Sequence, residues 1–573
     1  MAYDNSAEPY DDVVGTQVDE TALFRVALEQ LDAAHEEISR LSRLVDNGAG
    51  SRSGDVGHMS SRLVGMNALT VAMNEGDYES AYVWAKALFP RLKGNLHFLR
   101  AFRDVQSKRG EVTAALALVH RIAEIDKKTS PLAIMKLEGR LREISGWVPK
   151  IPGKPSPVMD SVPGRVLHLV KESRPFLSNG FTSRSHQNFK AEKAAGLEPI
   201  VVTEPGFPRN MAGNSFKKNE TVDGIQHIRL DIGDFDYAGM PADAFLNLFA
   251  QLAYEEVLRF KPSVIHASSG RRGYDTALVG LALKNKTGLP FVYEVRSFFE
   301  ANWTSDVQRE TRGEIFERRM QTEAMCMRAA DRVLTIGEAM KDELIARGVP
   351  SEKIGIIPNA VDASAFVPRP RDPNLARNYG LGNFPTFGYV SNMDHHRESQ
   401  ETLLRATKLL KERGTNFKCV LVGDGPRRAI LEKLAIELDI VDSVVFTGSV
   451  DHNEIPAYYS LIDYFVVPRT AERAAVYVTP LKPFEAMAMG KPVITSDLPA
   501  LVEIVKPPLR GFVFETDNDV ALADVLQSAH DQPSETEKVA AEGLKWVRTD
   551  RTWASNGQRY VTEFGRLVEG ADK

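Results

Sequence analysis

The chain has 573 residues and a mass of 63.5 kDa, which is too long for one ordinary domain because single hydrophobic cores stop growing at about 250–300 residues. Hydrophobic residues make up 43% of the sequence and charged residues 26%, a composition that is normal for a globular protein and excludes bulk disorder. The net charge of −6 and the isoelectric point of about 6.1 give no indication of nucleic-acid binding.

The first twenty residues and the cysteines indicate the cellular compartment in which the protein resides. Residues 1–20 include six acidic residues and no basic one, the opposite of a secretory signal. The two cysteines, Cys326 and Cys419, are too few for a disulfide framework and fit a reducing compartment. No apolar run approaches the roughly 18–20 residues of a membrane span. We therefore expect a cytoplasmic protein with at most peripheral contact to the inner face of a membrane.

Residues 1–58 are expected to form an acidic tail, one helix and a linker. Residues 21–46 contain no proline or glycine, and their apolar residues recur at alternating steps of three and four. These residues are Phe24, Ala27, Leu31, Ala34, Ile38, Leu41 and Val45. The spacing is typical of a coiled coil of about three heptads, which predicts a homodimer or higher oligomer through residues 21–46. An amphipathic helix packed on its own chain is the alternative. Residues 47–57 are rich in glycine and serine and indicate a linker.

Residues 59–150 are expected to form a module of helical hairpins. The segments Gly76–Ala81 and Gly110–Ala115 are similar and lie 34 residues apart. That period, with glycine in a turn and a small alanine where helices cross, resembles tetratricopeptide repeats. The module is predicted to contact a partner or the rest of this chain.

A proline-rich linker from Lys150 to Pro157 is followed by a change to alternating strands and helices. The expected strands are Arg165–Val170, Pro199–Thr203, Gly224–Leu230, Ser263–Ala267, Pro290–Val295, Arg332–Ile336 and Lys353–Pro358. The expected helices are Pro241–Phe260, Tyr274–Thr287, Glu310–Ala330 and Glu338–Arg347. Apolar strands that alternate with helices predict a parallel sheet covered on both faces. Residues 161–366 are thus predicted to be a Rossmann-like domain.

The same alternation returns over residues 374–550, followed by a C-terminal helix at residues 551–573. The expected strands are Thr386–Ser391, Lys418–Gly423, Val444–Thr447, Tyr464–Val467, Pro492–Thr495 and Gly511–Phe514. Two doubly wound α/β domains in tandem are therefore expected, with ligands at the carboxyl ends of the strands. Two such domains facing a cleft suit the joining of a nucleotide-linked donor to a separate acceptor, although fold alone does not establish function.

Two small-residue loops follow strands in these domains. Ser178-Asn179-Gly180 precedes a helix in the first domain, and Gly423-Asp424-Gly425-Pro426 follows a strand in the second. Such loops let backbone N–H groups approach a phosphate. Neither is a full dinucleotide fingerprint, because the third glycine is absent at the required spacing, and plain turns remain the alternative.

Four motifs in order resemble the retaining glycosyltransferases of family 4. They are Ile357-Pro358-Asn359-Ala360-Val361-Asp362 followed by Phe366, then Leu421–Pro426, Val445–Gly448 and Phe484–Val493. The resemblance runs roughly from residue 165 to residue 564. It implies a GT-B fold and transfer of a sugar from a nucleotide diphosphate with retention. It also implies no catalytic metal and no cofactor beyond the substrate nucleotide sugar.

The resemblance assigns roles to individual residues. Glu485 matches the glutamate that accepts hydrogen bonds from the donor ribose hydroxyls, a role that an ionised carboxylate suits. The expected donor-binding residues are Glu485, Thr447, Gly448, Gly423, Gly425, Thr479, Gly180 and Asn179. The expected catalytic residues are Arg397, Lys482 and Arg296, whose positive charges would stabilise the departing diphosphate. For each of these cations a solvated surface charge is the alternative.

Three departures from the family pattern qualify these assignments. Tyr477 stands where the family often has a second glutamate, and Thr479-Pro480-Leu481-Lys482-Pro483-Phe484-Glu485 resembles a subset of the family. Asn392 stands where an arginine is usual, and Arg397 is the nearest match for the usual lysine. The segment Val292–Glu300 replaces a frequent His-Asp pair.

The acceptor side is expected to include His266 and Glu300, although His266 could equally be a core-edge histidine. Arg469 and Arg473 are weaker candidates for the site. Asp234-Phe235-Asp236 has the form of a metal-binding DxD motif, but it lies in a loop before the Pro241 helix, and the resemblance implies a family that needs no such site. His395-His396 has no cysteine or carboxylate cluster at zinc spacing, so no metal site is expected there.

Two functions follow from these observations. The first is a metal-independent, retaining transferase of a hexose from a nucleotide sugar to a glycan or lipid-linked acceptor, in the family's usual setting of bacterial surface glycan or glycolipid synthesis. The second is a catalytically degenerate GT-B scaffold that binds partners through its helical N-terminal region.

Overall fold

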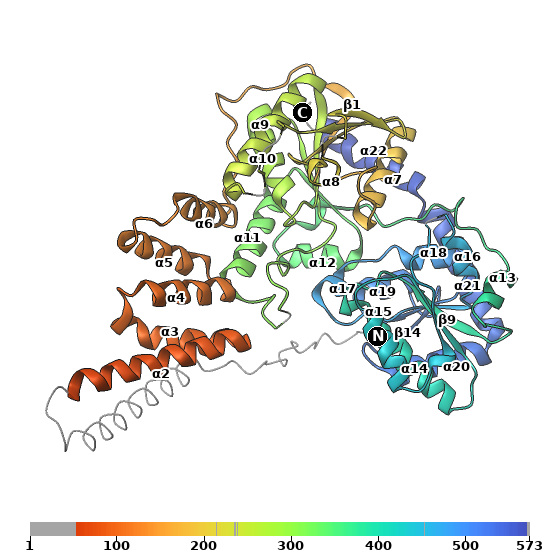
Figure 1. Cartoon of the computed structure of the whole chain (residues 1–573). Coiled ribbons are helices and arrows are strands. Elements are labelled where there is room, and N and C mark those ends of the chain that lie inside the picture. The colour runs from red at the N-terminus through yellow and green to blue at the C-terminus, as the bar shows by residue number, and fades with distance from the viewer. Residues whose placement is uncertain are drawn as a thin grey trace, which may run out of the picture. The chain divides into compact units, whose positions relative to one another are not determined.

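The computed structural model describes residues 53–569 apart from residues 214, 234, 235, 238, 307 and 452. The predicted coiled coil at residues 21–46 and Asp234 of the Asp-Phe-Asp segment therefore lie outside the described residues. The chain divides into two compact units, one that ends at Ser145 and includes residues 300–319, and one that consists of residues 146–299 and 320 onward. Figure 1 labels the elements of both units.

The helical unit consists of antiparallel neighbours joined by short turns. Its helices are α2 (Ser53–Glu75), α3 (Tyr78–Leu92), α4 (Leu96–Arg109), α5 (Val112–Ile125) and α6 (Pro131–Glu143). Each helix packs on the next, and α3, α4 and α5 bury a core that includes Leu88, Phe98 and Phe102. The all-helical character that the sequence predicted for this region is confirmed.

The 34-residue repeat has a structural basis. Gly76 and Gly110 adopt φ angles of +78° and +82° in the turns before α3 and α5, a conformation that favours glycine. Five residues after each glycine, Ala81 and Ala115 are buried where helices meet. The two segments thus occupy equivalent places in successive hairpins, while their assignment as tetratricopeptide repeats stays a prediction.

Residues 300–319 pack within the helical unit, a placement that sequence analysis did not anticipate. The Trp303 ring lies against Gly110, where an added Cβ would come within 2.9 Å of Trp303 Cη2. The Thr113 backbone N–H donates to Glu314 Oε2 at 2.7 Å. An excursion from the first α/β domain thereby becomes part of the helical core.

The first α/β domain contains an eight-stranded sheet in the order β3-β4-β2-β1-β5-β6-β7-β8. Its strands are β1 (Val162–Val170), β2 (Glu198–Thr203), β3 (Asn219–Val222), β4 (Ile225–Arg229), β5 (Pro262–Ser268), β6 (Phe291–Glu294), β7 (Arg332–Thr335) and β8 (Ile354–Ile356). Every predicted strand is present. The edge strand β3, which pairs antiparallel with β4, was missed because its residues are mostly polar.

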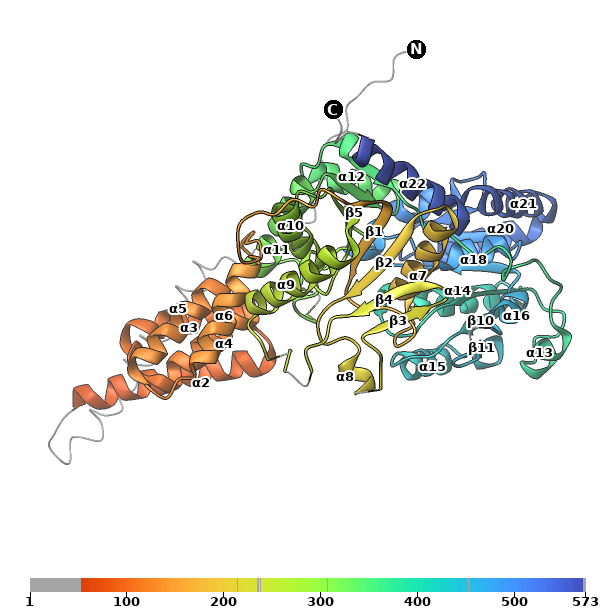
Figure 2. The ribbon, with the colours of Figure 1, turned by 90° about the horizontal axis from the view of Figure 1, so that it is seen from above.

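Helices cover both faces of this sheet, as Figure 2 shows. The helices of this domain are α7 (Gly180–Ala194), α8 (Arg209–Ala212), α9 (Ala242–Phe260), α10 (Asp275–Thr287), α11 (Gly313–Ala329) and α12 (Glu338–Ala346), with a 3₁₀ turn at Ser351–Lys353. Helices α9 and α10 pack on one face, with Phe249 and Leu278 in the core. On the other face α7 lies beside the last helix of the chain, α22 (Trp553–Glu569), which contributes Tyr560 and Phe564.

The second α/β domain contains a parallel six-stranded sheet in the order β11-β10-β9-β12-β13-β14. Its strands are β9 (Thr386–Val390), β10 (Lys418–Val422), β11 (Val444–Phe446), β12 (Tyr464–Val467), β13 (Val493–Ser496) and β14 (Phe512–Phe514), all of them predicted. Its helices are α13 (Pro373–Asn378), α14 (Gln400–Glu412), α15 (Arg428–Glu437), α16 (Ile455–Ser460), α17 (Arg473–Tyr477), α18 (Lys482–Ala488), α19 (Pro499–Val505), α20 (Asp519–Asp531) and α21 (Pro533–Asp550), with 3₁₀ turns at His396–Glu398 and Val441–Ser443. Among the described helices, none has the length and apolar character needed to cross a bilayer.

Candidate active site

Loops at the carboxyl ends of β9, β10, β11 and β12 contact one another, because these strands are neighbours in the second sheet. The Gly423 backbone N–H donates to the Gly448 carbonyl at 3.2 Å, so the loops after β10 and β11 touch. The Thr470 backbone N–H donates to the Arg397 carbonyl at 3.1 Å, which joins the loops after β9 and β12. The structure thus brings Gly423, Gly448 and Arg397 to one edge of the sheet.

Gly423 and Gly425 are required by packing. A Cβ on Gly423 would lie 2.0 Å from the Ser391 carbonyl oxygen, and one on Gly425 would lie 2.4 Å from the Met393 oxygen. These distances are far inside van der Waals contact, so the loop after β9 packs directly on the glycine backbone. A phosphate-binding role for the two glycines stays a prediction.

Helix α18 carries the strongest pair of predicted donor-site residues. Lys482 is its first residue and Glu485 lies one turn later, on the same face. Glu485 Oε2 accepts a hydrogen bond from the Tyr459 hydroxyl at 2.7 Å and lies 3.3 Å from Lys482 Nζ. Both contacts use Oε2, so within the described part of the chain Oε1 is the carboxylate oxygen that a ligand hydroxyl could reach. The Lys482 side chain remains 33% exposed.

Thr479 is contacted by the segment that follows β8 and connects the two α/β domains, which we call the crossover. Asn359 Nδ2 donates to the Thr479 carbonyl at 2.6 Å and lies 3.2 Å from its hydroxyl. Thr479 is buried, so this predicted donor-binding residue anchors its loop to the crossover that enters the second domain.

The arginines of this edge differ in what they contact. Arg397 is the more accessible one, with 35% of its side chain exposed. Arg469 is partly buried, with 13% of its side chain exposed, and donates to Glu398 Oε1 at 2.8 Å and to the Val478 carbonyl at 3.3 Å, so it holds loops together. Arg473 forms an ion pair with Glu343 of the first α/β domain.

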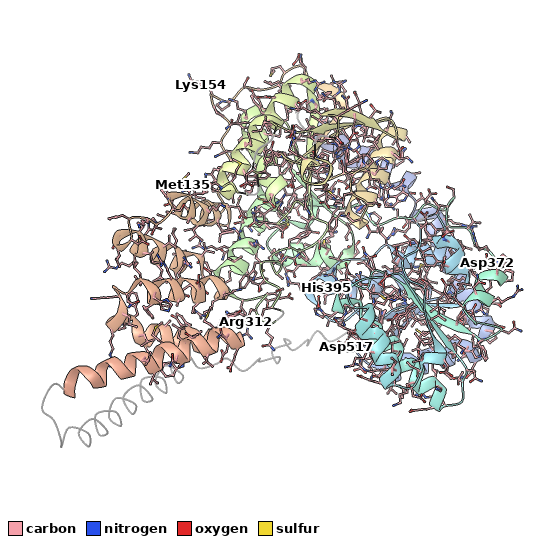
Figure 3. All side chains as sticks on the ribbon, viewed as in Figure 1. Met135, Lys154, Arg312, Asp372, His395 and Asp517 are labelled. Carbon is pink, nitrogen blue, oxygen red and sulfur yellow. The ribbon has the colours of Figure 1, made fainter. Side chains whose placement is uncertain are left out.

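The two histidines dismissed as a metal site have a carboxylate neighbour that their spacing did not reveal. His395, labelled in Figure 3, lies 3.7 Å from Glu472, and His396 forms an ion pair with the same carboxylate. Burial and then the nearby Arg397 charge lower the pKa of His395. Possible ligand atoms of the three residues lie within 4.8 Å of one another. Asp236 of the Asp-Phe-Asp segment caps a turn by accepting from the Gly239 N–H at 2.8 Å.

Asn179 and Gly180 begin helix α7 in the first α/β domain. The Asn179 side chain accepts from the Thr182 N–H at 2.9 Å, and the Thr182 hydroxyl accepts from the Asn179 N–H at 2.9 Å, which completes a capping box. The N–H groups of Gly180 and Phe181 have no partner within a helix at these positions. The helix start can therefore meet an anion.

The remaining predicted residues lie in the interior. Arg296 is buried, with Nη1 donating to Ser185 Oγ at 2.7 Å and Nη2 to Ser268 Oγ at 3.0 Å. Both ring nitrogens of His266 face buried side chains of the protein, so neither nitrogen is directed toward a sugar acceptor. Glu300 is buried and belongs to the helical unit. His266 and Glu300 are thus only 3% and 2% exposed, and their contacts with an acceptor stay predictions.

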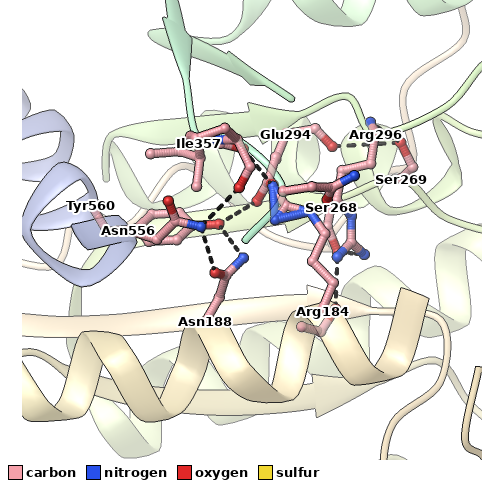
Figure 4. A network of polar contacts seen from close by, with 12 residues as sticks. Arg184, Asn188, Ser268, Ser269, Glu294, Arg296, Ile357, Asn556 and Tyr560 are labelled. Carbon is pink, nitrogen blue, oxygen red and sulfur yellow. Dashed lines mark hydrogen bonds and ion pairs between the residues drawn. The ribbon is translucent and has the colours of Figure 1, made fainter. Parts of the chain in front are cut away.

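Sequence reasoning overlooked four buried polar residues around Arg296 and His266. They are His168, Arg184, Glu294 and Tyr560, and Figure 4 shows the contacts that Arg184, Glu294 and Tyr560 make. A polar residue in an otherwise apolar buried strand is the signal that could have found His168 and Glu294. A separate polar cavity lies beside β3 and β4, lined by residues that include Phe176, Phe216 and Lys217, and it contains none of the predicted site residues.

Two glycosyltransferase families match the two α/β domains. Residues 374–546 match the family described as Glycosyl transferases group 1, and residues 179–360 match the one described as Glycosyl transferase 4-like domain. Together these matches span more than half of the chain.

The curated relatives match this chain over only part of their own length. The chain is 30% identical over 207 residues to the GDP-mannose-dependent alpha-(1-6)-phosphatidylinositol monomannoside mannosyltransferase of Mycobacterium tuberculosis, covering 36% of this chain and 54% of that protein. It is 28% identical over 239 residues to the alpha-monoglucosyldiacylglycerol synthase of Streptococcus pneumoniae, covering 41% of this chain and 51% of that protein. The chain thus spans about half the length of these relatives.

Solved structures share the fold. The sucrose-phosphate synthase of Thermosynechococcus elongatus superposes with a TM-score of 0.57 and 21% identity, covering 71% of this chain and 100% of that one. The Anabaena protein HepE in complex with UDP gives a TM-score of 0.55 and 16% identity, covering 70% and 100%. The α/β part of this chain therefore has the GT-B fold, and its two domains match glycosyltransferase domains, the 4-like type at residues 179–360 and the group 1 type at residues 374–546.

Proposed function

We propose that this protein transfers a hexose from a nucleotide-diphosphate sugar to a hydroxyl of a glycan or lipid-linked acceptor, with retention and without a metal ion. The group 1 domain would bind the donor and the 4-like domain the acceptor. The relatives support the donor class and a lipid-linked acceptor, because their names specify GDP-mannose, a phosphatidylinositol mannoside and a glucosyldiacylglycerol. We propose that the reaction takes place in the cytoplasm, at the inner face of the membrane if the acceptor is a lipid.

The arrangement of Glu485 and Lys482 carries this proposal. One carboxylate oxygen is held by Tyr459 and Lys482, so the other is oriented for the ribose hydroxyls of a nucleotide. The lysine stands at the start of the same helix with 33% of its side chain exposed, so its charge can act on an anion. Such a pair beside glycine loops suits a nucleotide diphosphate.

The chemical step needs stabilisation of the leaving diphosphate. Cations that are already in place lower the barrier because they need not reorganise as negative charge develops. Lys482 and Arg397 supply accessible charge from two loops of the donor domain. Arg296 contributes from the interior of the acceptor domain, where a low dielectric extends the reach of its charge.

Hydrolysis of nucleotide sugar by the purified full-length protein tests this function. GDP-mannose is the first donor to try, followed by UDP-glucose, with release of the nucleoside diphosphate as the readout. We expect turnover that continues unchanged in EDTA. Activity that disappears in EDTA and returns with Mg²⁺ or Mn²⁺ would contradict the metal-independent mechanism.

Calorimetry of nucleoside diphosphate binding tests the site itself. Glu485→Gln should weaken binding by about 1.5–3 kcal/mol, because the ribose loses a charged acceptor. Tyr459→Phe is the matched control, since it removes the 2.7 Å contact to Glu485 and leaves the carboxylate in place. It should weaken binding less. Equal affinity of wild type and folded Glu485→Gln would remove Glu485 from the site.

The degenerate scaffold remains a second candidate because Asn392 and Tyr477 stand where the family often has charged residues. A protein of that kind would hydrolyse no nucleotide sugar, whether or not it still binds a nucleoside diphosphate. Binding without turnover on any donor would favour it over the enzyme.

A further inference from the structure

Four ionisable side chains form a continuous chain of contacts inside the acceptor domain. His168 Nδ1 and His266 Nδ1 are 2.8 Å apart. At one end His168 Nε2 lies 2.9 Å from Glu192 Oε2, and at the other His266 Nε2 lies 3.2 Å from Glu294 Oε2. All four side chains are at most 3% exposed. We call this set, Glu192, His168, His266 and Glu294, the histidine chain.

Strand register places these groups together. His168 of β1 and His266 of β5 are direct partners across the parallel pair, so their rings project from the same face of the sheet. Two residues earlier on that face, Val166 and Val264 belong to an apolar cluster with Tyr560 and Phe564 of α22. The face therefore changes from apolar to ionisable toward the carboxyl ends of the strands, where ligands of such sheets bind.

The contact between the two histidines requires a proton. Two nitrogen lone pairs at 2.8 Å repel each other unless a hydrogen lies between them, so one Nδ1 donates and the other accepts. The two contacts between a histidine and a glutamate lie at ion-pair distances but lack the alignment of a hydrogen bond. Arg184 Nη2 donates to Glu294 Oε1 at 2.6 Å, so the charge of this carboxylate is balanced.

The surroundings decide the tautomers. Burial by itself would raise the pKa of Glu294, but the Arg184 charge and His266 outweigh it and lower the pKa well below its usual range. Burial lowers the pKa of His266, so this ring is neutral. A neutral His266 that faces an ionised Glu294 carries its hydrogen on Nε2, and its bare Nδ1 must accept from His168. His168 therefore holds a hydrogen on Nδ1.

Glu294 connects the histidine chain to the strand ends and to the crossover between domains. Its Oε2 also accepts from the Tyr560 hydroxyl of α22 at 2.7 Å, as Figure 4 shows. Arg184 Nη2 additionally donates to the Ile357 carbonyl at 2.7 Å, where the chain leaves β8 for the donor domain. Arg296 stands two residues after Glu294 and is held by serines of α7 and β5.

We propose that the histidine chain is a positioning device for the transfer reaction, in which His168 and His266 act through Glu294 on Arg184 and Arg296. The two histidines touch neither donor nor acceptor. They fix the charge and orientation of Glu294, which fixes Arg184 against the crossover and leaves Arg296 as the unneutralised cation at the strand ends. The kinetic part of this proposal rests on the proposed transferase function, whereas the tautomers do not.

Nuclear magnetic resonance of the full-length protein with ¹⁵N-labelled histidine tests the tautomers without reference to activity. The signals of the two rings are assigned by their loss in His168→Gln and His266→Gln. We expect Nδ1–H on His168 and Nε2–H on His266 at neutral pH, and a His266 ring that titrates below the range of an ordinary histidine. A His266 ring that titrates near pH 6.5 as exposed histidines do, or two Nε2–H tautomers, would overturn the proposal.

A pair of substitutions at His266 tests the positioning role. In His266→Gln the side-chain amide can reach the place of Nε2 and still donate to Glu294, whereas in His266→Asn it reaches only the place of Nδ1. We expect His266→Asn to lower kcat by about tenfold to a hundredfold with little change in KM for the nucleotide sugar. His266→Gln should keep most of the wild-type kcat. Losses that follow the melting temperature of the two variants, with no difference between them at equal stability, would show a structural role only. If wild type lacks turnover while the tautomers are as expected, the proposed function fails and the tautomer assignment stands.

Discussion

Glu204 follows β2 directly and is buried, with the Arg271 guanidinium as its ion-pair partner. Burial raises the pKa of Glu204 to about 7 despite the opposing charge of Arg271. Because the usual value is 4.5, the folded protein holds this proton more tightly than the unfolded chain does. The carboxyl therefore stabilises the fold at low pH, and this contribution is lost as the pH rises from about 4.5 through 7.

Glu204→Gln should therefore become more stable than wild type as the pH rises. A glutamine resembles the protonated carboxyl, so the difference in unfolding free energy should be near zero at pH 4.5 and reach at most about 3 kcal/mol above pH 7. Urea unfolding at a series of pH values measures it. A difference that does not depend on pH would mean that Glu204 titrates normally. Loss of the Arg271 partner adds little, because that side chain is half exposed.

Gly423→Ala should abolish nucleotide binding if the loop after β10 forms the donor site. The alanine Cβ would lie 2.0 Å from the Ser391 carbonyl at a φ of +133°, so the loops after β9 and β10 must separate. Gly565→Ala, on α22 and outside the predicted site, is the control, because no atom lies within 4 Å of the added Cβ. Calorimetric titration with the nucleoside diphosphate should show a large loss for the first variant only. Unchanged affinity of a folded Gly423→Ala would exclude this loop from the site.

At the level of elements, the helical unit and residues 300–319 are joined through Glu79 on α3. Its carboxylate accepts from Arg309 Nη1 at 2.7 Å and from Arg109 Nε at 3.0 Å. Burial works to raise the pKa of Glu79, but the hydrogen bonds from Arg109 and Arg309 outweigh it and the pKa is lowered. The ionised carboxylate thus holds one helix and one loop that are far apart in sequence.

Glu79→Gln should lower the unfolding free energy by about 1–3 kcal/mol, because two arginines lose a common charged partner. Glu124→Gln is the control, since the Glu124–Arg121 pair is largely exposed and should contribute less than about 1 kcal/mol. The stabilisation by Glu79 is present above its unfolded pKa of 4.5 and is lost as the pH falls through the lowered folded value. Thermal unfolding of both variants at pH 7 measures the difference. Equal losses would mean that Glu79 behaves as a surface charge.

At the scale of the molecule, contacts between distant segments join the two α/β domains. Asn359 of the crossover holds the Thr479 loop, Arg473 of α17 pairs with Glu343 of α12, and α22 returns to pack beside α7. The chain therefore crosses between the domains twice, at the residues after β8 and before α22. Substitutions in these contacts should alter both domains together.

Self-association through residues 21–46 remains a prediction at this scale. Seven apolar residues at heptad spacing cannot all be buried by one isolated helix, and exposed they would drive association. The double variant Leu31→Asp/Ile38→Asp should therefore halve the particle mass of the full-length protein in light scattering. Leu63→Asp, at an exposed position of α2, is the control and should leave the mass unchanged. Equal masses for all three proteins would mean that the seam packs on its own chain.

The sequence by itself determined the elements and the local pairs. Continuous apolar runs between turn residues located the strands of both sheets, because a buried parallel strand needs apolar side chains on both faces. Lys482 and Glu485 could be paired in advance, since a spacing of three residues places them on one face of a helix whatever surrounds it. The alternation of strands and helices and the GT-B fold followed from patterns within single segments and from their resemblance to known enzymes.

Only the tertiary structure decided which distant polar groups meet. Whether His168 faces His266 depends on the register of β1 against β5, because a shift of one residue would turn every side chain of the strand to the other face. Glu472 approaches His396 only because the loops after β9 and β12 are neighbours in space. Residues 300–319 join the helical unit because Trp303 and Glu314 find partners there that no local pattern indicates. The periodicity of the sequence determines which face of a segment is buried. Strand register and packing determine which side chain lies opposite on that face, and a buried charge is stable only when that side chain pairs with it.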